Sequence, residues 1–177
     1  AANYSGERPS KQHNGFLFDK GTVSEIDPAE GIMQLEAGDV FLKGANAINY
    51  DRKQAALLIG HPTGGTLGAT IGRIRSRRIQ LIHAVGLEKQ IPGDLHDLEQ
   101  TMIQKNSKGP ILWVSGGELF TELEAFATLT GVTARPLAAG GIGGAQGGLW
   151  FLLNGDEKTI TATQQLCTAI KGEPDFL

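Results

Sequence analysis

From residue 39 onward, short apolar runs alternate with longer segments whose apolar residues recur at helical spacing. Each apolar run ends in or near glycine, which is typical of buried parallel strands. Strand, helix and strand in repetition indicate an α/β protein with right-handed crossovers. The pattern therefore predicts a Rossmann-like, mostly parallel sheet with flanking helices. The strand-like runs are residues 40–42, 56–59, 80–85 and 111–114, and the helical segments are residues 67–78, 94–104 and 118–129.

The two ends of the chain are less regular. Residues 1–14 are polar and without period, so we expect a flexible arm there. Residues 16–23 and 32–35 read as N-terminal antiparallel strands, joined by a turn that contains Asp, Pro and Gly. Because no polar linker divides the rest, we expect a single α/β domain over residues 15–177. Its C-terminal part is predicted as strands at 133–139 and 149–153 and a helix at 159–170.

Local signals fix the expected helix ends. Asp94 follows Pro92-Gly93 and is a good N-cap for the second helix. Ser115 stands three residues before Glu118, which is the spacing of a capping box. Gly131 lies where a C-cap glycine is expected for that third helix.

Composition and charge exclude several classes of site. The net charge of −3 gives no global attraction to nucleic acid or to an anionic membrane. No apolar stretch approaches the ~20 residues of a membrane helix. The single cysteine excludes an intramolecular disulfide and a multi-cysteine metal site, and no two of the four histidines have metal-ligand spacing. We therefore expect a cytoplasmic protein with no metal, no membrane contact and no nucleic-acid partner.

Glycine is abundant, 25 of 177 residues, and it gathers at the ends of apolar runs. The first cluster, His-Pro-Thr-Gly-Gly-Thr-Leu-Gly at residues 61–68, lies between a strand and a helix. Free N–H groups and the helix dipole favour an anion at such a turn, where Thr63 and Thr66 would add hydroxyl donors and Gly64 and Gly65 would leave room. The lysine of a Walker loop is missing. The alternative is that Thr63 caps the helix and the glycines only permit close packing.

Four arginines follow at the other end of that helix: Arg73, Arg75, Arg77 and Arg78. Cations favour the C-terminal carbonyl groups of a helix, so a solvated helix end explains them. No aromatic residues are interleaved with these charges, as a nucleic-acid surface would require.

The second cluster, Ala-Ala-Gly-Gly-Ile-Gly-Gly-Ala-Gln-Gly-Gly at residues 138–148, lacks the dinucleotide-binding fingerprint and precedes a strand instead of a helix. It is a mobile flap, a close backbone contact or a second wall of a ligand site. For the last of these we nominate Gly140 and Gly141.

A few polar residues are candidates for chemistry. His61 follows a strand directly and would project from the ligand edge, whereas His83 lies in an apolar run and is expected to be a hydrogen-bonded core residue. Glu122 is the candidate carboxylate, on a helix that it is predicted to share with Glu118, although acidic residues in a first turn are ordinary helix stabilisers. Lys43 and Lys89 follow strand-like runs and either could neutralise an anion. The catalytic residues stay unknown.

The run Gly-Asp-Val-Phe-Leu-Lys-Gly-Ala-Asn-Ala-Ile-Asn at residues 38–49 resembles an element of the lactate-utilisation (LUD) type domains, which belong with the sugar-phosphate isomerase and CoA-transferase-like folds. The run Ile-His-Ala-Val-Gly-Leu-Glu-Lys-Gln-Ile-Pro at residues 82–92 is similar to the strand and turn that follow in those domains. The resemblance implies a site for a phosphorylated or CoA-like molecule, walled by Gly44, Ala45 and Asn46 and by residues 63–66. The glutamate-bearing stretch of the CoA-transferases is missing.

Two hypotheses follow. The first is a protein that binds a small anionic ligand at residues 63–66 with help from Lys43, Gly44, Asn46 or His61, and that acts as an isomerase or transferase. The second is a non-catalytic oligomeric or partner-binding domain in which the glycines serve packing, with a homo-oligomer as one form. No cofactor is identified by any motif.

Overall fold

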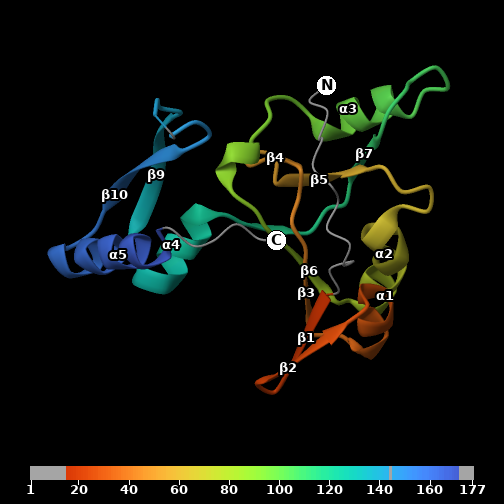
Figure 1. The fold of residues 1–177 in the computed structure, drawn as a ribbon, viewed down its shortest axis with the longest axis horizontal. Helices are drawn as coiled ribbons and strands as arrows, with labels where there is room; N and C mark the ends of the chain where they lie inside the picture. The colour runs from red at the N-terminus through yellow and green to blue at the C-terminus, as the bar shows by residue number, and fades with distance from the viewer. Residues whose placement is uncertain (1–14, 144, 172–177) are drawn as a thin grey trace.

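The computed structural model describes residues 15–143 and 145–171. The expected arm, residues 1–14, lies outside this part of the chain. Figure 1 shows the arrangement of the elements. The strands are β1 (Gly15–Asp19), β2 (Thr22–Ile26), β3 (Val40–Leu42), β4 (Ala47–Asn49), β5 (Gln54–Ile59), β6 (Gln80–Ala84), β7 (Ile111–Val114), β8 (Glu118–Phe120), β9 (Thr133–Ala139) and β10 (Leu149–Asn154). The α-helices are α1 (Pro28–Gly31), α2 (Gly65–Arg77), α3 (Leu95–Met102), α4 (Glu122–Thr130) and α5 (Glu157–Ile170), and the 3-10 helices are η1 (Ile32–Gln34) and η2 (Leu87–Lys89).

Helices and strands are mixed along the chain, which confirms an α/β protein in the broad sense. The sheets are smaller and less parallel than predicted. One three-stranded sheet, in the order β3-β6-β8, is parallel throughout. The other, in the order β4-β5-β7, is antiparallel. The prediction of a mostly parallel sheet is therefore wrong, because short buried runs such as β5 and β7 look the same in either direction.

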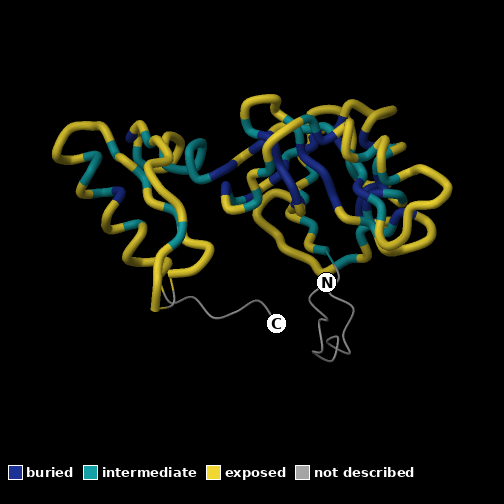
Figure 2. The backbone as a smooth tube through the Cα atoms, turned by 90° about the horizontal axis from the view of Figure 1, so that it is seen from above, coloured by how far each residue is buried: buried dark blue, intermediate teal, exposed yellow. Residues whose placement is uncertain are grey.

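The core forms where these two sheets and their helices meet (Figure 2). Ile48 of β4 and Ala55 of β5 are completely buried in one cluster, together with residues that follow β6 and with Leu119 of β8. A second cluster packs Ile74 of α2 against β6, and a third packs Leu95 of α3 against β4, β5 and β7. Both α2 and α3 thus bury apolar residues in the core, whereas Leu98 of α3 is exposed.

The N-terminal region is an antiparallel hairpin of β1 and β2, not the predicted pair of residues 16–23 with residues 32–35. The predicted single strand over residues 16–23 is divided, because Lys20 and Gly21 both take positive φ values, 48° and 87°, at the turn. The strand predicted at residues 32–35 is instead the 3-10 helix η1. It continues from α1, which Asp27 caps through its side chain and Pro28 begins.

The third helix begins later than the capping-box spacing at Ser115 predicts. Gly116 and Gly117 have φ values of 67° and 99°, and this left-handed pair redirects the chain into β8 instead of a helix. The helix α4 then begins at Glu122, and Glu118 lies on the strand. Glu118 and Glu122 therefore do not share a helix.

A capping box does start α4, but further along the chain than predicted. The hydroxyl group of Thr121 accepts a hydrogen bond from the N–H of Leu123, and Glu124 Oε2 accepts one from the N–H of Thr121 at 2.8 Å. Gly131, at φ 77°, ends the helix as predicted. Asp94 also caps α3 as predicted, by accepting a hydrogen bond from the N–H of His96.

Residues 122–143 and 145–171, here named the C-terminal unit, lie to one side of the two three-stranded sheets (Figure 1). They contain the antiparallel pair β9 and β10 and the helices α4 and α5, close to the predicted ranges. Figure 2 shows that most of this unit is exposed. Val132 and Thr163 are its buried residues among those described. No helix of the described chain is long and apolar enough to cross a membrane.

Candidate functional site

The turn between β5 and α2 has the form that the sequence predicts, a buried strand followed by glycines and a helix. The N–H of Gly64 donates to the carbonyl oxygen of His61 at 3.0 Å, and Gly64, at φ 85°, is the N-cap of α2. No side chain caps this helix. Thr63 does not cap it, contrary to the alternative interpretation, because the Thr63 hydroxyl group lies 3.0 Å from His61 Nδ1.

Close contacts explain two glycines of this turn. A Cβ atom on Gly64 would lie 2.8 Å from the indole ring of Trp113 and 2.9 Å from the Cα of Gly68. A Cβ atom on Gly68 would collide with the carbonyl oxygen of Thr63. These positions are glycine because the turn, the helix and Trp113 pack without space for a side chain. Gly65 has room around it and is set apart by its φ of 58°.

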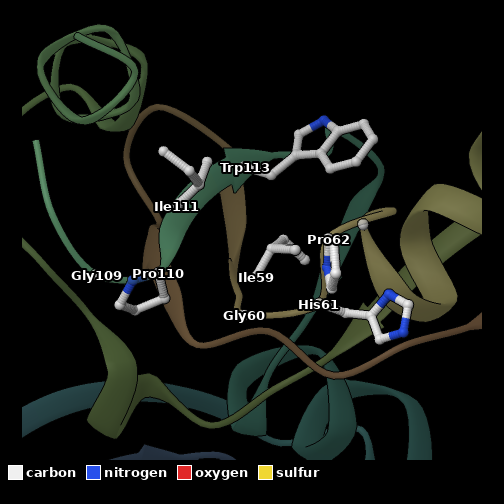
Figure 3. Close-up of a pocket in the computed structure, with 9 residues that line it drawn as sticks. Ile59, Gly60, His61, Pro62, Gly109, Pro110, Ile111 and Trp113 are labelled. Atoms are coloured by element: carbon white, nitrogen blue, oxygen red, sulfur yellow. The ribbon is translucent and has the colours of Figure 1, made fainter. Parts of the chain in front are cut away.

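A pocket of about 460 Å³ opens beside the turn (Figure 3). Its volume falls within the range of small-molecule sites. The side chains of Ile59, Pro62, Ile111 and Trp113 surround the hollow, and the His61 ring lies at its edge beside α2. The lining residues are Ile59, Gly60, His61, Pro62, Gly64, Gly109, Pro110, Ile111 and Trp113.

The polar end of this pocket favours negative charge. The first N–H groups of a helix have no partner within the helix, and its N-terminus carries roughly half a positive charge. The first turn of α2 holds no acidic residue that would neutralise this charge. His61 is the titratable residue among those that line the pocket. Gly64 brings the start of α2 to the pocket, whereas Thr63, Gly65 and Thr66 are not among the lining residues.

Asn46 lies near the same end of β5, but its side chain is already used. Asn46 Oδ1 accepts the N–H of Leu58 at 2.9 Å and so extends the pairing of β4 with β5. Gly44 is exposed with open space around it. The backbone of Lys43 bonds to β6, since its N–H donates to the carbonyl oxygen of Ile82. None of these three nominated residues lines the pocket.

Gly140 and Gly141 belong to the connection between β9 and β10, in the C-terminal unit. Gly140 donates its N–H to the carbonyl oxygen of Gly148 and accepts a hydrogen bond from the Trp150 indole at 3.3 Å. Figures 1 and 2 both place this unit and α2 on opposite sides of the molecule. The structure therefore does not bring the two glycine clusters into one site.

Glu122 joins α4 to the segment that follows β6. Its Oε2 atom accepts the N–H of Leu87 at 2.9 Å, which is the first residue of η2. Lys89 likewise donates to the carbonyl oxygen of Ala45 at 3.0 Å. Both side chains have structural partners away from the pocket.

The sequence hypothesis missed the opposite wall of the pocket. Gly109, Pro110, Ile111 and Trp113 lie far along the chain from the turn, and they reach it because β7 pairs with β5 in the register that places Trp113 opposite Leu57. A Gly-Pro pair before an apolar run was the available signal, but the pairing of strands cannot be read from one sequence.

The structure also brings His83 and Ser115 together, a pair that the sequence hypothesis did not find. His83 is completely buried, and its Nε2 lies 2.9 Å from Ser115 Oγ and 2.8 Å from the carbonyl oxygen of Gly116. Its Nδ1 lies 3.1 Å from the carbonyl oxygen of Lys43. Burial is the main reason that the pKa of His83 is below its ordinary value. Because Ser115 is also buried, this pair joins the two sheets and is closed to a substrate.

The arginines at the end of α2 bind the protein itself. Arg73 donates to the carbonyl oxygens of Ile32, Met33 and Leu35 and forms an ion pair of 2.9 Å with Glu36. Arg75 donates to the carbonyl oxygen of Ser115 at 2.6 Å. These contacts agree with a helix end that is solvated in part and tied to neighbouring loops. Among the described residues, no group of three or more His, Cys, Asp or Glu side chains could hold a metal ion.

No protein-family model matches the chain, and no curated protein or solved structure matches it either.

Proposed function

We propose that this protein binds a small anionic ligand in the pocket beside α2, with the anionic group at the N-terminus of that helix. The observation that supports this most is the combination of a helix start without a side-chain cap or acidic residues and an adjoining apolar pocket. Either half alone is common in proteins. Together they offer separate places for a charged group and for an apolar or aromatic group.

The two ends of the pocket favour a phosphorylated or CoA-like molecule. N–H groups at a helix start are suited to phosphate oxygens. The Trp113 ring, which is half-buried, offers an aromatic surface to a planar group on the other side. A simple inorganic anion would use only the first of these features.

We also propose that the chain is related to the LUD-type domains, with the parallel strands β3, β6 and β8 as the Rossmann-like part of the fold. An isomerase or transferase reaction would use His61 as its acid or base, since it is the titratable group at the pocket. A second acid or base would have to come from the ligand or from a partner. Binding is therefore the function that we assign first.

Thermal denaturation in the presence of inorganic phosphate, a sugar phosphate, ATP or coenzyme A tests this proposal. A ligand at a hundredfold its Kd stabilises the folded state by about 2.7 kcal/mol. We expect ATP or coenzyme A to raise the melting temperature more than phosphate does. If none of the four compounds raises it, the proposal is wrong.

Thr66→Asp sharpens this test because it should stabilise the free protein and weaken its binding of an anionic ligand. Thr66 is in the first turn of α2, and a carboxylate there stabilises the helix dipole by about 0.3–1 kcal/mol. The same carboxylate repels an anionic ligand. We expect a higher melting temperature without ligand and a smaller rise with it. Thr66→Asn is the matched control, because asparagine has nearly the same shape as aspartate and no charge. The ligand should still raise the melting temperature of this variant.

A second candidate function is association with a partner protein. The observation that favours it is the number of large apolar side chains exposed in the C-terminal unit. Leu129, Leu137, Ile142, Trp150, Leu152 and Ile170 are each between 54% and 92% exposed. Exposed apolar surface of this kind is typical of interaction sites.

A further inference from the structure

His61 stands at the edge of the pocket, and its two ring nitrogens have different surroundings (Figure 3). Nδ1 faces the chain itself: the N–H of Thr63 donates to it at 3.3 Å, and the Thr63 hydroxyl group lies 3.0 Å from it. Nε2 has no hydrogen-bond partner among the residues that the structure describes. Because His61 is exposed and lines the pocket, Nε2 is the nitrogen that remains for a ligand.

The N–H of Thr63 decides which ring nitrogen carries the proton. A backbone N–H can only donate, so Nδ1, which accepts from it, holds a lone pair instead of a hydrogen. In a neutral imidazole the proton is then on Nε2. The Thr63 hydroxyl group can donate to the same lone pair and so strengthens the preference. The hydrogen bonds at one nitrogen therefore fix the tautomer of the whole ring.

The turn holds the His61 ring in this position before a ligand arrives. The carbonyl oxygen of His61 accepts the N–H of Gly64 at 3.0 Å, and the ring of Pro62 restricts the backbone between His61 and Thr63. A Cβ atom on Gly65 would lie 3.7 Å from the Cβ of His61, so the side chain rests beside the start of α2. A group that is already ordered loses little conformational freedom on binding.

We propose that Thr63 is a positioning residue, which holds His61 in the tautomer that offers Nε2–H to an anionic oxygen of a ligand in this pocket. A hydrogen bond from an N–H group to an ionised phosphate or carboxylate is stronger than one between neutral groups. The inference rests on the proposed function and deepens it, because it states what His61 does for the ligand.

The donor role limits the chemistry of the pocket. Nε2–H stabilises negative charge on a ligand oxygen, but a nitrogen that already carries a proton cannot take another from the ligand. A base would need the proton on Nδ1, where it would face the N–H of Thr63. His61 therefore favours binding of an ionised phosphate or carboxylate group, which only accepts hydrogen bonds, over abstraction of a proton.

Nitrogen NMR of the protein without ligand tests the tautomer, because the chemical shift of a ring nitrogen shows whether it carries a proton. At about pH 8, where an ordinary histidine is neutral, we expect His61 to carry its proton on Nε2. His96 is the reference in the same spectrum, since its Nδ1 lies 3.5 Å from the Glu99 carboxylate, which favours a proton on Nδ1. A proton on Nδ1 of His61, or an equal mixture of tautomers, would overturn the proposal.

Two variants of Thr63 test its positioning role in the same spectrum. Thr63→Val removes the hydroxyl group and keeps the branched shape, so we expect a larger share of the tautomer with its proton on Nδ1. Thr63→Ser retains the hydroxyl group and should retain the tautomer. If both variants give the same spectrum, the Thr63 side chain does not position His61 and the proposal is wrong.

Two variants of His61 test the donor role. Asparagine can still accept the N–H of Thr63 in an Asx turn, but its amide group does not reach the place of Nε2, which the longer glutamine side chain does. By calorimetry with coenzyme A, we expect His61→Asn to raise the Kd about tenfold or more, and His61→Gln to raise it much less. An equal loss of affinity in both variants would contradict a donor at Nε2.

The two kinds of measurement separate this proposal from the proposed function. If the unchanged protein binds coenzyme A and NMR finds the proton on Nδ1, ligand binding stands and the inference on His61 and Thr63 is wrong. If the unchanged protein binds neither coenzyme A, ATP, a sugar phosphate nor inorganic phosphate, the proposed function is wrong, and the donor role fails with it whatever the tautomer.

Discussion

The two glycine-rich segments of this protein have similar composition and different surroundings, and each has a tryptophan beside it. In the first, Trp113 packs on Gly64, and side chains at Gly64 or Gly68 would collide with their neighbours. In the second, Trp150 is largely exposed and Gly140 and Gly143 have open space around them, although a Cβ atom on Gly141 would lie 2.5 Å from that of Ala145. Glycine density therefore does not identify a ligand loop, and the atoms that surround each glycine distinguish packing from an open connection.

Adding one methyl group to the first segment should give the largest change in the free energy of unfolding. Gly68→Ala would place a Cβ atom against the carbonyl oxygen of Thr63, so we expect the free energy of unfolding to fall by about 2–3 kcal/mol. Gly72→Ala, one turn later on α2, meets open space and should raise it by about 0.5–1 kcal/mol. Chemical denaturation of both variants measures the difference. If both variants changed the free energy of unfolding equally, close packing would not explain the glycines of the first segment.

As the pH falls, the region around the first glycine-rich segment should lose stability before the region around the second. The pKa of His83 lies below its ordinary value of 6.5, chiefly because of burial. The unfolded chain therefore binds the proton more readily, so stability is complete above pH 6.5 and is lost as the pH falls below it. One such group contributes at most about 1.4 kcal/mol per pH unit. All four histidines precede residue 97, so none lies in the C-terminal unit.

Denaturation of the unchanged protein and of His83→Gln between about pH 5 and 8 checks this expectation. The variant should lose this part of the pH dependence, and His96→Gln, at an exposed histidine, should retain it. Hydrogen exchange should show that protection at low pH falls first in β6 and its neighbours. A pH dependence that is the same in all three proteins would show that His83 does not cause it.

A methyl group in the second segment should cost less than one at Gly68. Gly143 has a φ of 65°, and a Cβ atom there would meet no neighbour within 4 Å, so only the left-handed backbone opposes Gly143→Ala. We expect a loss of about 1 kcal/mol. A loss as large as that of Gly68→Ala would show that this connection is packed as tightly as the first. The proposed difference between the two glycine-rich segments would then be wrong.

Local features of the fold could be predicted from the sequence. The strands at residues 40–42 and 111–114, the cap at Asp94 and the glycine that ends α4 each depend on a few neighbouring residues. Strand direction could not be predicted, because β5 and β7 are apolar in either orientation and their pairing depends on distant residues. The start of α4 was misplaced, because Ser115 has a buried histidine as its partner and Thr121 is the cap.

Only the part of the candidate site that depends on neighbouring residues could be predicted from the sequence. The turn at residues 61–66 could be found from its glycines and its place between a strand and a helix. Its opposite wall, with Trp113, depends on the pairing of β5 with β7. Gly140 and Gly141 were grouped with the turn because their composition is similar, and composition does not specify position.

The most direct test of ligand binding beside α2 is the fluorescence of Trp113 in Trp150→Phe protein during titration with coenzyme A. Trp113 lines the pocket and packs on the first turn of α2, so a ligand there changes its surroundings. We predict a saturable change in its emission, which Thr66→Asp weakens and Thr66→Asn does not. An emission that stays constant while calorimetry on the same protein detects binding would place the ligand elsewhere and contradict the site.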